Sequence, residues 1–191
     1  MYRIDASPNP DQQSTVAAAR QGDADAWETL YTGIYARLRG YVQRRVAAED
    51  TEDLVSETLA RAVAGIDRFQ WSPAGFDGWV FGIARRVIAD HHRRRFRAEK
   101  RFGHLPEDVD QTPRVGEAVE QADEHAELWA AFATLGERDR EILELRVVAG
   151  LSSEAVAEVL DTNPGAIRTA QSRALARLRE TLAKNEEQQD A

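Results

Sequence analysis

The apolar residues of this chain recur with the period of an α-helix, and this period limits the folds that are open to it. Between residues 12 and 96, and again from about residue 124, apolar side chains recur every three or four positions, which places them on one face of an α-helix. No segment of useful length alternates apolar and polar residues as a half-buried strand would. The sequence therefore predicts an all-α fold. The expected helices span residues 12–20, 25–47, 50–66, 76–96, 124–135, 137–148, 152–160 and 164–183.

A break in the helical pattern divides the chain into two domains. Residues 103–117 contain two prolines, two glycines and no period, which is typical of a linker. We therefore expect two small helical domains joined by a flexible acidic linker, with a frayed polar tail at the C-terminus. The expected segments are an N-terminal tail 1–13, a first domain 14–102, the linker 103–123, a helix-turn-helix domain 124–184 and a tail 185–191.

Charge is distributed in blocks along the chain. The net charge of −8 by itself argues against a nucleic-acid partner. Attraction to phosphate depends on local basic surface, however, because salt screens charges over about 10 Å. Residues 85–101 hold eight Arg or Lys against two acids, residues 106–127 hold eight acids against one arginine, and residues 165–184 hold five Arg or Lys against one acid. Nucleic acid therefore remains a possible partner of the two basic segments.

Several classes of site are disfavoured by the composition. The chain has no cysteine, which excludes disulfides, thiolate metal sites and a cysteine nucleophile. The first residues have no apolar signal-peptide core and no apolar run approaches ~18 residues, so we expect a cytoplasmic protein without membrane insertion. His91 and His92 are adjacent and point in different directions on a helix, which disfavours a metal pair. We expect no cofactor, no metal site and no catalytic residue.

The strongest local pattern is a helix-turn-helix over residues 150–168. Ser152 or Ser153 can cap a short helix, residues 161–163 form a turn, and Pro164 suits the first position of the second helix. In this motif the second helix enters the major groove of DNA. An ordinary helical hairpin with a solvated basic face is the alternative. The candidate base and phosphate contacts are Asn163, Arg168, Thr169, Ser172, Arg173 and Arg177.

The first domain ends in a helix that combines an apolar stripe with arginines, behind an aromatic loop. The segment FDGWVFGIARRVIADHHRRRFR follows the loop at residues 69–75. Basic residues attract the nucleic-acid backbone and aromatic side chains hold unstacked bases, a combination that suits single-stranded or melted DNA. Individual residues have simpler explanations: Trp79 fits the core, and residues 93–95 fit a solvated helix end.

Three stretches in order resemble the extracytoplasmic-function sigma factors of bacterial RNA polymerase. They are AEDTEDLVSETLARAVAGIDRF, WVFGIARRVIADHHRRR and LGERDREILELRVVAGLSSEAVAEVLDTNPGAIRTAQSRALARLR, and the resemblance covers about residues 14–100 and 124–184. The pattern departs from the family at Arg86, where Asn is frequent, and at Ala170 and Gln171, where Arg and Leu are common.

The resemblance implies roles for particular residues. It implies partners as well: core RNA polymerase, through the clamp helices of its largest subunit and its flap, promoter DNA, and an anti-sigma factor. The acidic linker would thread the polymerase cleft, and the helix-turn-helix residues would read the −35 element. Residues implied to bind the clamp helices are Glu52, Asp53, Leu54 and Glu57. Residues implied to recognise and melt the −10 element are Gln70, Trp71, Ser72, Arg85, Arg86, Asp90, Arg93 and Arg94.

Three functions compete on this evidence. A sigma factor explains all three stretches. A polymerase-independent DNA-binding regulator explains the helix-turn-helix alone. An enzyme using His91, His92, Asp50 and Asp53 is disfavoured, because no Gly-rich phosphate loop and no nucleophile–base pair is evident. The charge blocks further suggest that the free chain holds its two domains together, with the linker or a partner covering the basic surfaces.

Overall fold

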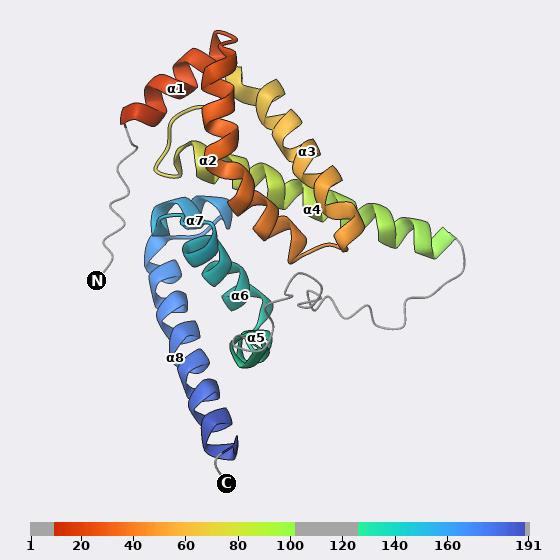
Figure 1. Ribbon diagram of the computed structural model, residues 1–191, viewed down its shortest axis with the longest axis vertical. Helices are drawn as coiled ribbons and strands as arrows, with labels where there is room; N and C mark the ends of the chain where they lie inside the picture. Colours follow the sequence, from red (N-terminus) through yellow and green to blue (C-terminus); the bar gives the residue numbers. More distant parts are fainter. Residues whose placement is uncertain (1–9, 102–125, 190–191) are drawn as a thin grey trace.

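The computed structural model describes residues 10–101 and 126–189 (Figure 1). Within them the regular structure is helical throughout, which confirms the all-α prediction. The expected linker lies outside the described residues. The first domain contains α1 (Pro10–Arg20), α2 (Ala24–Gln43), α3 (Ala48–Gly65), a 3₁₀ turn η1 (Ile66–Arg68) and α4 (Gly75–Arg101). The second contains α5 (Ala126–Ala133), α6 (Glu137–Leu143), a π-helical turn η2 (Glu144–Val148), α7 (Ser153–Val159) and α8 (Pro164–Gln189).

Several helix ends differ from the sequence prediction, and α2 already ends at Gln43 where residue 47 was predicted. Helix α3 has its N-cap at Ala47, so it begins before the predicted start at residue 50, and Asp50 and Thr51 lie inside the helix. Thr51 is buried, and its hydroxyl donates to the Ala47 carbonyl at 3.2 Å. Helix α4 continues to Arg101, beyond the predicted end at 96. Helix α8 continues to Gln189, so the prediction of a frayed tail is wrong over residues 185–189.

The first domain is built on the apolar faces of α2, α3 and α4. Leu38 and Tyr41 of α2 and Val55 of α3 are at most 1% exposed, and Phe81 of α4 is fully buried among them. The rings of Tyr41 and Phe81 meet edge to face, 5.4 Å apart. This core fixes α3 and α4 side by side, as Figure 1 shows.

The apolar core continues without a break into the second domain. Val156 of α7, Leu145 of η2 and Ile142 of α6 are at most 1% exposed and belong to the same buried cluster as the first-domain core. We call the contact of α2 and α4 with η2 and α7 the interdomain seam. In the structure the two domains are in contact through this shared core, which agrees with the expectation that they are held together. The expectation that the linker or a partner covers the basic surfaces stays a prediction, because the linker lies outside the described residues.

Charged side chains also cross the interdomain seam. The Arg37 guanidinium donates to the Ala149 carbonyl at 2.8 Å and to Asp77 of α4 at 2.6 Å. Arg45 forms an ion pair with Glu144, whose carboxylate is 5% exposed. Burial raises the pKa of Glu144, and the facing Arg45 offsets part of that rise. A buried charged pair is costly to break, because either partner left alone lacks compensation.

Candidate nucleic-acid interface

An aromatic cluster anchors the loop between η1 and α4. The Phe69 ring is buried and lies 5.0 Å from the Trp71 ring and 5.0 Å from the Trp79 ring. Arg20 of α1 donates to the Ile66 carbonyl at 3.0 Å and also to the Phe69 carbonyl, which satisfies the backbone at the start of the loop. Trp79 was expected in the core. It packs against the core but is only half-buried.

The predicted loop residues remain accessible on this anchored loop. Gln70 is exposed, whereas Trp71 and Ser72 are half-buried. The Ser72 Oγ accepts from the Ala74 N–H at 3.2 Å and donates to Glu158 of α7 at 2.9 Å. The loop is therefore held in one shape by its own backbone, by its aromatic neighbours and by the second domain.

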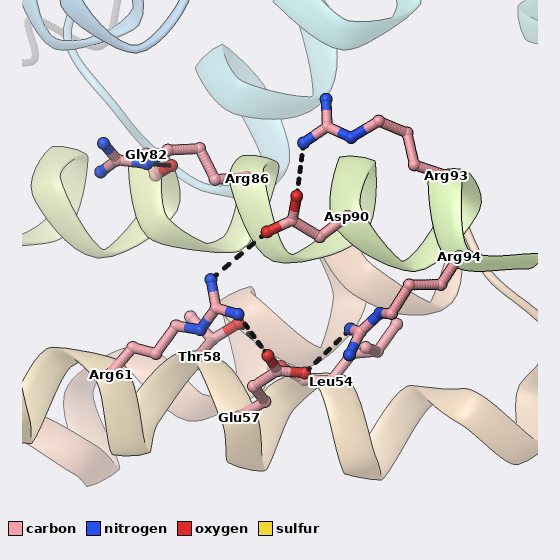
Figure 2. A network of polar contacts seen from close by, with 9 residues as sticks. All are labelled: Leu54, Glu57, Thr58, Arg61, Gly82, Arg86, Asp90, Arg93 and Arg94. Carbon is pink, nitrogen blue, oxygen red and sulfur yellow. Dashed lines mark hydrogen bonds and ion pairs between the residues drawn. The ribbon is translucent and has the colours of Figure 1, made fainter.

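Predicted residues of α4 and α3 join in one network of ion pairs, drawn in Figure 2. Glu57 of α3 contacts Arg61 at 2.5 Å and Arg94 of α4 at 3.4 Å. Asp90 of α4 pairs with Arg93, and its second oxygen lies 3.6 Å from Arg61. These arginines lower the pKa of Asp90. The network brings together one residue expected to face polymerase and three expected to face DNA.

A basic hollow of about 460 Å³ opens beside this network, between α3 and α4. Trp79 and Ile83 provide apolar surface in it. Arg86 also lines it. The Arg86 Nε donates to the Gly82 carbonyl at 3.1 Å (Figure 2). Sequence reasoning identified Arg86 and missed Arg61 and Arg68, which also line the hollow.

The predicted polymerase-facing residues of α3 fall on two sides of the helix. Glu52 and Asp53 are exposed, whereas Leu54 is 4% exposed and belongs to the core. Arg39 at 2.6 Å and the Tyr35 hydroxyl at 2.8 Å hold Glu52 and lower the pKa of its carboxyl. The Leu54 side chain therefore fixes the helix, and the acids form its outer face.

The helix-turn-helix has the expected local geometry. Ser152 caps α7 by accepting from the Ala155 N–H at 3.0 Å. The turn places Asp161 at φ 51°, and the Thr162 N–H donates to the Ala157 carbonyl at 2.8 Å. Asn163 caps α8 through a 2.8 Å bond from the Ala166 N–H. The Asn163 oxygen thus has a structural role besides the predicted contact with DNA.

The predicted −35 residues lie on the outer face of α8. Asn163, Arg168, Thr169, Ser172, Arg173 and Arg177 are all exposed. Arg168 is 3.2 Å from Glu154, and Arg177 is 2.9 Å from Asp139. Pairs this exposed contribute little to stability, so phosphate can replace the carboxylates at small cost. The opposite face, with Ile167 and Ala170, is buried.

The histidines of α4 do not form a metal centre with nearby acids. His91 Nε2 lies 3.4 Å from Asp50, and desolvation lowers the pKa of His92. Among the described residues, no group of three or more His, Asp or Glu side chains could hold a metal ion. No helix in the described part of the chain is long and apolar enough to cross a bilayer.

Family models match both domains. The Sigma-70 region 2 model matches residues 30–98, which include α3, the loop and most of α4. The Sigma-70 region 4 model matches residues 125–178, which include the helix-turn-helix. The matched ranges fall on the two domains described above, one on each side of the interdomain seam.

Curated relatives align along most of the chain. The ECF RNA polymerase sigma factor BldN of Streptomyces coelicolor is 35% identical over 171 residues, which are 87% of this chain and 64% of BldN. The ECF RNA polymerase sigma factor ShbA of Streptomyces griseus subsp. griseus is 32% identical over 187 residues, 88% of this chain and 96% of ShbA. The ECF RNA polymerase sigma factor SigD of Mycobacterium tuberculosis is 30% identical over 179 residues, which are 88% of this chain and 82% of SigD.

Two solved structures share the fold. CnrH, in complex with the cytosolic domain of CnrY, superposes with a TM-score of 0.65 at 22% identity, over 91% of this chain and 97% of CnrH. The sigma factor RpoE of Bartonella quintana, in complex with the anti-sigma factor NepR, gives a TM-score of 0.59 at 26% identity, over 82% of this chain and 96% of that one. The arrangement of helices is therefore one already seen in experimental structures.

Proposed function

The chain belongs to the ECF family of RNA polymerase sigma factors, and from this premise we propose how its two domains divide promoter recognition and strand opening. A sigma factor acts with RNA polymerase to begin transcription, and this chain does so. Matches to both sigma regions disfavour the polymerase-independent regulator, because that hypothesis accounts for the helix-turn-helix domain alone.

The first domain is proposed to hold the melted strand of the −10 element, at the loop of residues 69–74, which we call the −10 loop, and in the basic hollow. The observation that carries this proposal is the basic hollow, which Trp79 lines together with Arg61, Arg68 and Arg86. Stacking of a base on an aromatic side chain is worth about 1–3 kcal/mol, and arginines bind the phosphates on either side. The acids that hold Arg93 and Arg94 are partly exposed, so DNA phosphates can displace them at a cost of about 0.2–1 kcal/mol per pair.

The second domain is proposed to read the −35 element as duplex. Its recognition helix α8 presents Arg168, Thr169 and Ser172 on one exposed face, with Arg173 and Arg177 one to two turns further along. Side chains at the start of such a helix reach base edges, and later basic residues reach phosphates. Gln171 takes less part in this contact, because Arg146 holds its amide oxygen at 2.9 Å.

The partners of this chain are proposed to be core polymerase and an anti-sigma factor. The exposed acids Glu52 and Asp53 on α3 suit a basic helical surface, as the clamp helices would provide. The sigma factor RpoE of Bartonella quintana was solved in complex with the anti-sigma factor NepR. We extend this type of partner to the present chain.

Transcription with purified components tests the proposal as a whole. The protein is mixed with core RNA polymerase and a promoter library, and the transcripts are sequenced. We expect transcripts that share −10 and −35 motifs and depend on the protein. Sequence-specific DNA binding by the protein alone, with no stimulation of transcription, would show that the regulator hypothesis is the right one.

Asp53→Ala tests the polymerase-facing side of α3. Asp53 is exposed, so its loss should leave the fold intact and weaken binding to core polymerase about ten-fold. Binding is measured by competition with a labelled sigma factor, and folding by circular dichroism. Glu49→Ala is the matched control, because it removes an exposed acid from the first turn of the same helix. Equal effects of the two substitutions would refute a specific role for Asp53. Leu54→Ala is unsuitable, since it would cost about 2–5 kcal/mol of stability.

A further inference from the structure

The basic hollow between α3 and α4 contains a partly accessible aromatic ring. The Trp79 ring packs against Phe69 at 5.0 Å and against Phe76 at 5.7 Å. A Cβ added at Gly65 would lie only 3.3 Å from Trp79 Cζ2, so glycine at this position leaves room for the indole. Trp79 is nonetheless only half-buried and lines the hollow. Part of the fixed ring is therefore available for stacking with a planar ligand.

Trp79, Ile83 and Arg86 lie in one stripe along α4. They follow one another at helical spacing, and all three line the hollow. The Arg86 side chain folds back along this stripe, because its Nε donates to the Gly82 carbonyl at 3.1 Å (Figure 2). Gly82 lies one turn closer to Trp79 than Arg86 does, so this bond draws the guanidinium toward the indole. A base that stacks on Trp79 therefore has its edge within reach of Arg86.

The charged side chains that line the hollow are arginines, which have N–H donors and no acceptor. They differ in how far they are already engaged. Arg61 is held by Glu57 at 2.5 Å and lies 3.6 Å from Asp90. Arg86 is different, because within residues 10–101 and 126–189 no carboxylate pairs with it and only its Nε is used, by the Gly82 carbonyl. Its Nη1 and Nη2 therefore remain as two adjacent donors at the end of the side chain.

Two adjacent donors beside a stacking surface favour guanine over the other bases. Guanine carries two acceptors, O6 and N7, on one edge, and a guanidinium binds them through two hydrogen bonds. Adenine has an amino group beside its N7, so one N–H would face another. The pyrimidines have a single ring, which covers less of an indole than a purine does. Guanine alone combines the larger stacking surface with two acceptors on the same edge.

We propose that Arg86 is a specificity-determining residue that gives the first domain a preference for guanine in the −10 element. An unpaired guanine stacks on Trp79 and presents O6 and N7 to the Nη1 and Nη2 of Arg86. This inference rests on the proposed function, which places the melted strand in the hollow. Arg68 of η1, which is exposed in the same hollow, contacts phosphate and does not distinguish bases.

Transcription from promoters with a randomised −10 region tests this preference. The protein is mixed with core RNA polymerase, and the bases of the transcribed promoters are counted at each position. At one position guanine should be enriched about ten-fold over adenine. Arg86→Asn should favour adenine there instead, because an asparagine amide binds N6 and N7 of adenine. Arg68→Ala is the matched control and should lower transcription from all promoters without changing the preferred base. Both arginines are exposed, so the variants should fold, which circular dichroism checks.

Base analogues test the contact atom by atom. In a promoter whose −10 region is held open by mismatches, the preferred guanine is replaced by 7-deazaguanine, which lacks N7, or by hypoxanthine, which lacks only the 2-amino group. Binding of the complete polymerase complex is measured by fluorescence anisotropy. With the unchanged protein, 7-deazaguanine should weaken binding about five-fold or more and hypoxanthine by less than about two-fold. With Arg86→Ala the three bases should bind equally.

The outcomes separate this inference from the proposed function. A −10 consensus without guanine would overturn the inference, as would a guanine preference that persists in Arg86→Asn. An equal effect of 7-deazaguanine on the unchanged protein and on Arg86→Ala would overturn it too. In each of these cases transcription still depends on the protein, so the proposed function stands. A library that gives no transcript dependent on the protein would instead refute the proposed function.

Discussion

The −10 loop and the recognition helix α8 differ in how the free chain presents them. The loop is pinned by Arg20 from one side and by Glu158 from the other. The recognition helix buries Ile167 and Ala170 and leaves its basic face to solvent. Both regions carry residues suited to DNA binding, so residue type alone does not explain why they differ in exposure. The difference comes from the interdomain seam, which borders the loop and leaves the outer face of α8 uncovered.

The two regions also show how differently ion pairs behave with burial. The pairs of Arg168 and Arg177 lie at the surface, where each contributes at most about 1 kcal/mol and can be exchanged for phosphate. The Arg45–Glu144 pair lies in the seam, with side chains 15% and 5% exposed. Its loss would leave a charge without compensation in a place that water does not reach. The surface pairs can therefore be exchanged for contacts with DNA, whereas the buried pair holds the two domains together.

Arg45→Met, which removes the buried ion pair, should have the largest effect on stability. It leaves the Glu144 carboxylate buried without its cation and removes the guanidinium that lies 3.7 Å over the Tyr41 ring. We expect a loss of about 3 kcal/mol in the free energy of unfolding, measured by urea denaturation. Arg39→Met is the matched control, because this arginine lies in α2 shortly before Arg45 and its pair with Glu52 is about half exposed. Its loss should cost less than about 1 kcal/mol. Similar losses in both variants would mean that the seam does not form in solution.

Arg168→Ala tests the exposed face of α8 that is proposed to read the −35 element. Its guanidinium is exposed on α8 and should be worth about 1–3 kcal/mol at a base edge of the −35 element. Duplex affinity, measured by fluorescence anisotropy on a promoter from the transcription screen, should fall accordingly, with core-polymerase affinity unchanged. Arg179→Ala, another exposed arginine of α8, should weaken binding less and equally for all sequences. Loss of both DNA and polymerase binding would indicate an unfolded domain.

The smallest expected effect is a pH dependence of the seam. Burial raises the pKa of Glu144 in the closed chain, against the attraction of Arg45 and Arg44 and with added repulsion from Glu141. The protonated form is thus favoured by closure, so this contribution is present below the ordinary glutamate pKa of 4.5 and is lost as pH rises through the raised value. Small-angle scattering should show slightly more extended molecules at about pH 8 than at about pH 5. Glu144→Gln should remove this difference in extension between the two pH values. If the difference is unchanged in that variant, other titrating groups cause it.

Much of the candidate site could be predicted because its signals are local. The Ser152 cap, the turn before Pro164 and the basic run on α4 are each contained within a few residues. Arg61 and Arg68 were missed because each is an isolated arginine, and only the packing of α3 on α4 brings them to Trp79. Leu54 was placed on the polymerase face for the opposite reason, since its position among acids does not reveal which side of the helix is buried.

The sequence by itself determined the helices, the division into two domains and the helix-turn-helix, because apolar period and cap residues act over one or two turns. Three features became visible from the packing of the helices: the domains share a core, Glu144 is buried against Arg45, and α7 contacts the −10 loop. Such contacts join residues far apart in the chain, and their free energy depends on shape and desolvation at the place where the surfaces meet.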